Sequence, residues 1–373
     1  MVNRNNYIFA DKVLYNMSYQ TIMSQKNDTV KRDNRFDFYK GVLIFGVTYG
    51  HVLTILQNGA GSAYAIHRFI RTYDMPMFSF ISGFFLYTSL LRNTLKTNIL
   101  NKIGGILLPS LLWEYVPCFL TGRFHIVPSG FWFTYSLFSC LLIVIVIESL
   151  LKHFLIKTIL YGLVILIFHT IIIDRYKIGF LLCPCIVGYY YHLLLGRGYL
   201  QDGTGYIKAT VVLLFITSWC FWKADYNVWN AGCSILKQGE ICNQMFKILF
   251  RFAIGILGTF SMLWFFDIIY SSLNVSNSFN QYITNNFVII GKVTIELYIL
   301  QCCFVRYAAK IVKNVVELLS FNPFVYNESL LVLIIAPLFT VIALYGFYYL
   351  QVVLKKLPLI GNYCFAVPLK DIF

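Results

Sequence analysis

Ten stretches of the sequence are apolar over about 17 to 25 residues, and this pattern constrains the fold more than any other feature. A helix of roughly 20 residues crosses the hydrocarbon core of a bilayer. Only 12% of the 373 residues are charged, against about 25% in a typical soluble domain. We therefore expect an all-α polytopic transmembrane helical bundle of about ten spans, at 36–57, 73–92, 103–121, 130–151, 155–173, 177–195, 206–222, 247–270, 287–309 and 329–354.

The segments outside these stretches predict a simple organisation. Residues 1–35 are polar and basic and contain no apolar core of signal-peptide length, which indicates a cytoplasmic N-terminal tail. A transmembrane domain at 36–354 and a cytoplasmic C-terminal tail at 355–373 follow. This orientation places more basic residues inside than outside, although Arg68 and Arg71 fall in a predicted outer loop. We expect a multi-pass protein of a bacterial cell membrane (inner or plasma membrane).

The net charge of +14 and the ten cysteines do not by themselves identify a site. The positive residues are scattered between apolar stretches, which favours contact with anionic lipid of the bilayer and not with nucleic acid. The cysteine spacings match no metal site, so no metal is expected. Cys233 and Cys242 share one predicted outer loop, and the sequence leaves open whether they form a disulfide. It also leaves the oligomeric state open.

Lys40 and His51 in the first apolar stretch are the leading functional candidates. They lie eleven residues apart, or three turns plus roughly 20°, so they share one helix face about 16–17 Å apart. Lys40 near the cytoplasmic end is suited to a phosphorylated ligand, and the deeper imidazole is suited to taking a proton from a hydroxyl. The alternative is that Lys40 reaches lipid headgroups and His51 makes an interhelical hydrogen bond.

Other ionisable residues inside apolar stretches have competing interpretations. Glu114 beside Trp113 fits a polar and aromatic lining for a sugar, or equally an aromatic belt at the membrane interface. Lys292 and Glu296 lie four residues apart on the ninth predicted helix, where they would neutralise each other. His169 in the fifth stretch is interpreted as a hydrogen-bonded structural histidine.

Several of these residues lie in motifs that resemble the integral-membrane acyltransferase 3 family. RFDFYKGVLIFGVTYGH (35–51) is similar to the family's first-helix signature, a basic residue followed after ten residues by histidine. DMPMFSFISGFFL (74–86) resembles its Met-Pro-x-Phe and Ser-Gly-Phe motif. NKIGGILLPSLLWEY, FWFTYSL and GKVTIELYILQ resemble later segments in the same order. The chain departs from the family where Lys40 replaces the commoner arginine and Gln301 replaces a frequent histidine, and no fused esterase-like domain is expected.

The resemblance implies a membrane O-acyltransferase that moves an acetyl or related acyl group. The donor would be cytoplasmic acyl-CoA, usually acetyl-CoA, and the acceptor a hydroxyl of a cell-surface glycan or lipid-linked sugar. His51 would act as general base or as a transient acyl carrier, with Asp37 orienting Lys40. The CoA phosphates would be held by Lys40, Arg35, Arg92 and Lys102. The acceptor would be bound by Glu114, Trp113, Trp132, Tyr298 and Gln301.

A second function class is a transporter or exporter of a glycan or small solute, in which the buried charges line the pathway. Transporters often combine paired repeats with broken helices, and the sequence shows no such pairing. A third possibility is an acyltransferase that moves a different acyl group, such as succinyl, or that acts on a small metabolite or peptide. Release of CoA in the presence of a glycan acceptor would distinguish the first class from the second.

Overall fold

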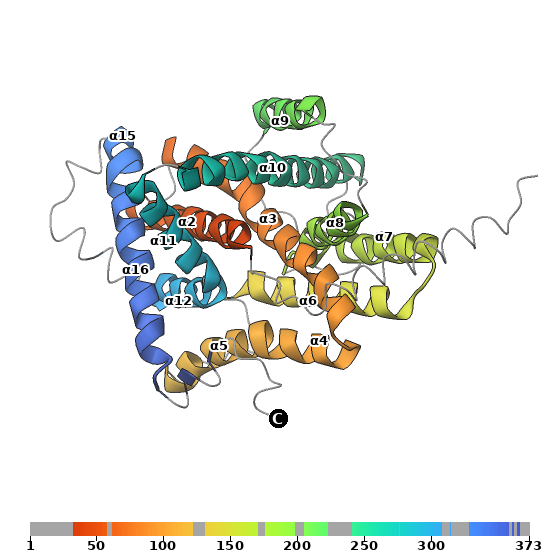
Figure 1. The fold of residues 1–373 in the computed structure, drawn as a ribbon, viewed down its shortest axis with the longest axis horizontal. Helices are drawn as coiled ribbons and strands as arrows, with labels where there is room; N and C mark the ends of the chain where they lie inside the picture. The colour runs from red at the N-terminus through yellow and green to blue at the C-terminus, as the bar shows by residue number, and fades with distance from the viewer. Residues whose placement is uncertain are drawn as a thin grey trace, which may run out of the picture.

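The structure, a computed structural model, is helical wherever it describes secondary structure (Figure 1). It describes residues 33–57, 62–121, 131–170, 176–197, 205–222, 241–275, 277–307, 314, 328–357, 360–361 and 364–365. The first half contains α2 (Asn34–Gln57), α3 (Ser62–Arg92), α4 (Leu95–Lys102), the π-helical η2 (Ile103–Leu107), α5 (Leu108–Thr121), α6 (Trp132–Leu150), α7 (Phe154–Thr170) and α8 (Ile178–Gly196). The second half contains α9 (Gly205–Cys220), α10 (Ile241–Val275), α11 (Ser278–Lys292), α12 (Thr294–Tyr307), α15 (Glu328–Leu330), the π-helical η6 (Leu331–Ile335) and α16 (Ala336–Leu354).

The helices confirm the all-α class and contain most of the described part of each apolar stretch, on one helix or on consecutive helices. Within the described residues, five helices are long and apolar enough to cross a membrane, or six if the bent pair α11–α12 is one span. Large apolar side chains such as Leu155, Leu213 and Leu333 are 64 to 74% exposed, which suits contact with lipid and not with water. The chain is therefore a multi-pass helical membrane protein, and the arrangement of ten spans with cytoplasmic termini stays a prediction.

Two sequence predictions fall on residues that the structure leaves undescribed. The N-terminal tail is described only from Asp33 onward, and the C-terminal tail only in part. The possible Cys233–Cys242 pair also lies outside the described residues, because 223–240 is not described.

The ninth apolar stretch is not one helix, as the sequence had predicted. It is divided at Val293 into α11 and α12, whose axes are bent by 76°. Lys292 and Glu296 consequently belong to different helices, and the expectation that they neutralise each other is wrong. Instead, Lys355 Nζ at the end of α16 lies 3.1 Å from Glu296 Oε1. Glu296 thus pairs with a lysine at the end of a different helix, and not with Lys292 of its own predicted helix.

The helix that contains the second apolar stretch begins earlier than predicted. The apolar stretch starts at 73, but α3 starts at Ser62 and continues to Arg92. Arg71, which the sequence had placed in an outer loop, therefore lies within α3 and is only 6% exposed. Hydropathy underestimated this helix because the part before residue 73 contains polar residues, of which Arg71 and Thr72 are buried.

Glycines set the closest helix approaches in two places. At the α2–α11 crossing, a Cβ on Gly41 would overlap the carbonyl oxygen of Phe287, and a Cβ on Gly291 would overlap that of Asp37. At the α3–α8 crossing, Gly83 and Gly188 similarly face carbonyl groups of the opposite helix. Only residues without a Cβ allow backbones to approach so closely, which is a common way of packing membrane helices.

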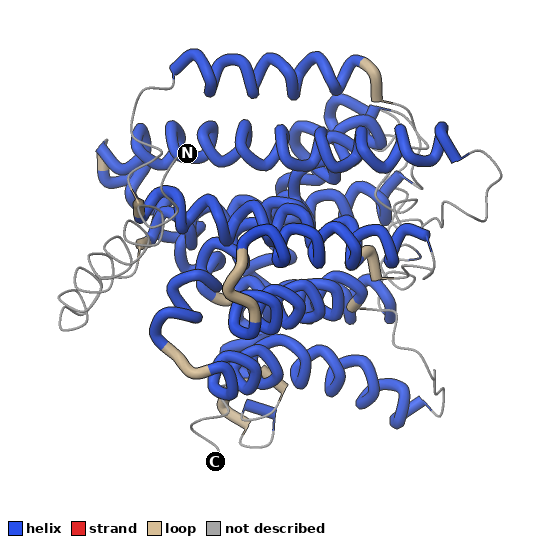
Figure 2. The backbone as a smooth tube through the Cα atoms, turned by 90° about the vertical axis from the view of Figure 1, so that its right-hand side faces the viewer, coloured by secondary structure: helices blue, strands red, loops and turns tan. Residues whose placement is uncertain are grey.

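The helices do not form a simple parallel bundle. In Figure 1, α16 runs across the direction of α6 and α10 at one side of the molecule, and Figure 2 shows the other helices in successive tiers. After α16, the chain returns to α5, where the Trp113 indole donates a hydrogen bond to the Cys364 carbonyl at 2.7 Å and Phe365 is 1% exposed. This contact fixes the end of the described chain beneath α5.

Candidate active site

The first part of the candidate site is the N-terminal end of α2. Lys40 Nζ lies 2.8 Å from Asp37 Oδ1, as their spacing of three residues predicted. Asp37 is 2% exposed, and its carbonyl faces Gly291 of α11. The ion pair is therefore held rigidly against a neighbouring helix. The contact is confirmed, while the catalytic role assigned to Asp37 stays a prediction.

Arg35 differs from Lys40 because it lies at the exposed end of the same helix. Its guanidinium bonds the Asp33 carboxylate at 2.8 Å and lies 3.8 Å from Asp267 Oδ1 on α10. Partial burial works to raise the pKa of Asp33, but hydrogen bonds from Arg35 outweigh it and hold that pKa below its ordinary value. Arg35 is thus occupied by carboxylates before any ligand arrives.

Arg92 is the last residue of α3, and Lys102 is the last residue of α4, which begins after a short turn. This turn is tied down by the buried Asn98, whose amide donates to the carbonyl oxygens of Ser89, Asn93 and Thr94. Arg92 is exposed, and Lys102 lies close enough to the thiol of Cys185 on α8 to interact with it electrostatically. Burial lowers the pKa of the Lys102 ammonium.

These two cations lie at the same end of the molecule as the start of α2. The rings of Phe36 on α2 and Phe84 on α3 are 4.7 Å apart, so α3 runs back towards the first turn of α2 and ends at Arg92. Neither Arg92 nor Lys102 has a carboxylate within ion-pair distance in the described part of the chain. Two uncompensated cations at the ends of consecutive helices suit the binding of an anion.

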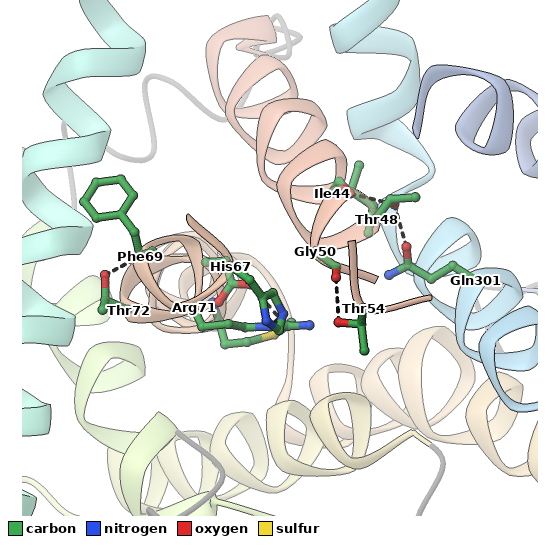
Figure 3. Close-up of polar contacts among 11 residues, drawn as sticks. Ile44, Thr48, Gly50, Thr54, His67, Phe69, Arg71, Thr72 and Gln301 are labelled. Carbon is green, nitrogen blue, oxygen red and sulfur yellow. Dashed lines mark hydrogen bonds and ion pairs between the residues drawn. The ribbon is translucent and has the colours of Figure 1, made fainter. Parts of the chain in front are cut away.

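The second part of the candidate site surrounds His51, further along α2. His67, Arg71 and Asp74 line one face of α3, where they occupy positions i, i+4 and i+7. Arg71 Nε donates to His67 Nε2 at 3.1 Å, and Arg71 Nη1 lies 3.2 Å from Asp74 Oδ2. Figure 3 shows His67 and Arg71 reaching together from α3 toward the segment of α2 that carries Gly50. His51 lies within electrostatic range of both side chains.

Two further helices add polar groups to this buried cluster. Tyr298 on α12 is hydrogen-bonded to the thiol of Cys302, and both interact electrostatically with Arg71. Glu114 on α5, 1% exposed, also acts on Cys302. The structure thus brings Glu114 and Tyr298 to the same cluster as His51 through Arg71 and Cys302.

The aromatic candidates divide into two groups. Trp132 packs on Phe133 with ring centroids 6.0 Å apart, and Phe133 in turn packs on Tyr298 at 5.5 Å. Trp132 therefore joins the cluster through one intervening ring. Trp113 instead directs its indole N–H to Cys364, so that donor is already used within the chain.

Gln301 reaches the cluster from α12 and leaves one polar atom unused. Its Oε1 lies 2.5 Å from Thr48 Oγ1 on α2, three residues before His51. Gln301 is 1% exposed, and one end of its amide has no hydrogen-bond partner among the described residues. A buried amide that uses only one end is costly without a ligand, because an unsatisfied donor loses its bonds to water.

The sequence prediction missed His67, Arg71 and Asp74. The available signal was their spacing in HRFIRTYD, which places all three on one helical face directly before the Met-Pro motif. Cys302, whose thiol contacts Tyr298, was also not singled out from the sequence. Among the described residues, no three His, Cys, Asp or Glu side chains are grouped so as to hold a metal ion.

Comparison with known proteins gives a relationship over a limited part of the chain. Over 88 residues, the chain is 33% identical to nodulation protein NolL of Mesorhizobium japonicum (strain LMG 29417 / CECT 9101 / MAFF 303099). The match covers 23% of this chain and 24% of that protein, so about a quarter of each is aligned. No protein-family model matches the chain, and no solved structure matches it.

Proposed function

We propose that the chain is a membrane O-acyltransferase that moves an acetyl or related acyl group from cytoplasmic acyl-CoA to a hydroxyl of a cell-surface glycan or lipid-linked sugar. The observation that carries this proposal is His51. It lies inside an apolar helix among His67 and Arg71, and no residue in the described part of the chain is hydrogen-bonded to its ring. The motif resemblance and the partial similarity to NolL support the same conclusion.

The donor would bind at the end where α2 begins and α3 ends. Acetyl-CoA supplies an acyl group already activated as a thioester, and its phosphates require cations. Arg92 and Lys102 fit this requirement because they have no carboxylate partner in the described structure. Lys40 would add its charge while Asp37 fixes its position, and Arg35 would have to leave Asp33 to contribute.

The acceptor would bind at the deep cluster. His51 would take the proton of the attacking hydroxyl as a general base, a role that suits an imidazole near neutral pH. Glu114, Tyr298 and the unused end of the Gln301 amide would bind other hydroxyls of the sugar. Trp132 and Trp113 would supply aromatic surface beside them.

The test uses the full-length protein in proteoliposomes with acetyl-CoA labelled in its acetyl group. The acceptor is the lipid-linked glycan fraction of the source cell, and the two readouts are free CoA thiol and label in the glycan. We expect both to depend on the acceptor and to be lost in His51→Ala at equal protein levels. Unlabelled glycan, together with surface glycans of identical mass with and without the gene, would reject the proposal.

A transporter is the second candidate, because one observation favours it. The α11–α12 pair is broken with a 76° bend, and discontinuous helices form substrate sites in many transporters. The same proteoliposomes distinguish the two functions. A transporter would move glycan across the bilayer without consuming acetyl-CoA, whereas an acyltransferase would release CoA with or without movement of the glycan.

A further inference from the structure

The hydrogen bond between Arg71 and His67 determines which ring nitrogen of His67 carries a proton. An arginine side chain keeps its charge in proteins and offers only donors. Because Arg71 Nε donates to His67 Nε2, that nitrogen must accept and cannot carry a hydrogen. His67 is then a neutral imidazole with its proton on Nδ1, as the two nitrogens of a neutral ring divide the donor and acceptor roles.

Two further contacts hold His67 in this state. Arg71 is itself bound by Asp74, which is fully buried and also accepts the backbone N–H of Met75 at 2.6 Å. The Cδ2 edge of the His67 ring lies against Gly50, where a Cβ would come within 2.5 Å of it. Gly50 therefore provides the space in which the ring rests on α2.

The Nδ1–H group of His67 has no hydrogen-bond partner in the described structure, and neither has His51. The two residues lie within electrostatic range of each other, with Gly50 of α2 beneath one ring and His51 next in the chain. One histidine is therefore able to accept a proton, while the other is restricted to donating a hydrogen bond. Acyl transfer needs both functions at adjacent positions.

We propose that His67 is a second catalytic histidine, whose Nδ1–H donates a hydrogen bond to the acyl carbonyl oxygen while Arg71 and Asp74 act as positioning residues. This inference rests on the proposed acyl transfer. The acceptor oxygen forms a bond to the carbonyl carbon, its proton passes to His51, and the carbonyl electron pair moves to the oxygen that His67 contacts. The C–S bond then breaks, and the proton on His51 passes to the CoA sulfur.

Two substitutions at His67 separate its two nitrogens. Glutamine places its amide oxygen near the position of Nε2, so His67→Gln keeps an acceptor for Arg71 but removes the second donor. Asparagine places its amide nitrogen near the position of Nδ1, so His67→Asn keeps the donor but loses the bond to Arg71. We expect kcat to fall about 10²-fold to 10³-fold in His67→Gln, with KM for acetyl-CoA within about threefold of wild type.

His67→Asn should recover part of the loss, to within about tenfold of the wild-type kcat. A structural role limited to holding Arg71 predicts the opposite order, with His67→Gln the more active variant. That order, or a His67→Gln variant as active as wild type, would overturn the proposal.

A glycine pair on α2 provides a test that leaves both histidines in the chain. Gly50→Ala forces the His67 ring to move, and kcat should fall as it does in His67→Gln. The matched control is Gly46→Ala, one turn earlier, where the new methyl would meet only the side-chain Cγ2 of Ile70 at 3.3 Å. Gly46→Ala should stay within about twofold of wild type. Equal kcat in the two alanine variants would contradict the proposal.

A spectroscopic measurement decides the tautomer independently of activity. Protein labelled with ¹⁵N in its histidine rings is reconstituted in bilayers, and the His67 signals are assigned by their loss in His67→Gln. Near neutral pH, we expect a protonated Nδ1 and an unprotonated Nε2. Protonation at Nε2 would overturn the inference even if the enzyme is active. If the wild type transfers no acetyl group, the proposed function fails together with the catalytic role, while the tautomer assignment is still decided.

Discussion

The two ends of α2 hold ionisable residues in opposite ways. At the N-terminal end, Asp37 and Lys40 form a closed pair at 2.8 Å, pressed against the glycine-lined crossing with α11. Further along the helix, neither His51 nor the Nδ1 of His67 from α3 has a hydrogen-bond partner in the described structure, and the buried Gln301 amide is half used. One end satisfies its charges within the chain, while the other retains polar atoms that have no partner in the described part of the chain.

This difference distinguishes donor binding from the reaction, whereas the sequence showed only that Lys40 and His51 share one helix face. In a closed ion pair, the carboxylate fixes the position of the ammonium, whose charge suits the binding of a phosphorylated donor near the membrane surface. Open nitrogens inside an apolar bundle are costly unless a ligand uses them, so the deep end is where we expect the reaction. Mutations at the deep end should therefore change kcat, and mutations at the shallow end should change KM for the donor.

The largest expected effect tests the deep end directly. His51→Ala removes the general base, and kcat for acetyl transfer should fall about 10³-fold, within the range usual for such groups. The assay is acceptor-dependent release of CoA, normalised to the amount of folded protein. An unchanged kcat would show that His51 is not the general base, and that the two ends of α2 do not differ in the way proposed.

The next effect concerns the stability of the deep end. Asp74→Asn leaves the buried Arg71 without its carboxylate, and we expect the free energy of unfolding to fall by about 3–5 kcal/mol. The measurement is unfolding in mixed micelles with increasing SDS. The double variant Asp74→Asn with Arg71→Met removes both charges and should recover most of this loss. A double variant as unstable as the single one would show that the ion pair is not the cause.

A third prediction concerns the crossing that fixes the shallow end. Gly291→Ala places a methyl against the Asp37 carbonyl and should lower the free energy of unfolding by about 1–3 kcal/mol. Gly162→Ala is the matched control, because the new Cβ would meet nothing within 4 Å in the described structure apart from the backbone of its own helix. The same SDS titration compares them. Equal stability would mean that the backbones at this crossing move apart easily.

A fourth prediction distinguishes donor binding from chemistry. The double variant Asp37→Asn with Lys40→Met removes the pair without leaving either charge alone. We expect KM for acetyl-CoA to rise about tenfold, as for the loss of one charge-assisted contact, with kcat within about threefold of wild type. Steady-state kinetics in proteoliposomes provide both constants. A loss confined to kcat would assign the pair to the reaction instead.

The smallest effect is a pH dependence at Lys102. Its ammonium binds phosphate only below its pKa, so KM for acetyl-CoA should rise as pH increases through that value. Because burial lowers the pKa of Lys102, the rise should begin at a lower pH than for an ordinary lysine of pKa 10.5. Lys102→Arg should not show this rise, because arginine stays charged. At alkaline pH, its KM for acetyl-CoA should therefore be a few-fold lower than that of the wild type. Parallel profiles for the two proteins would exclude Lys102 from donor binding.

Much of the fold could be predicted because the length and hydropathy of a transmembrane helix can be recognised in the sequence. The stretches at 103–121 and 329–354 coincide with helical structure almost from end to end. Prediction failed where polar residues lie within a helix or where a helix breaks. Residues Ser62 to Thr72 extend α3 beyond its apolar part. The break at Val293 follows Gly291, which packs against Asp37 of α2, a contact that the local sequence does not show.

The sequence by itself determined that the chain is helical and membrane-embedded, and that Asp37 and Lys40 meet, because these properties depend on composition and on residues within one turn. It also singled out His51 as an ionisable residue in an apolar helix. Only the tertiary structure decided its neighbours. His67, Arg71, Tyr298 and Gln301 come from two other helices, and their meeting depends on crossings set by glycines far apart in the chain.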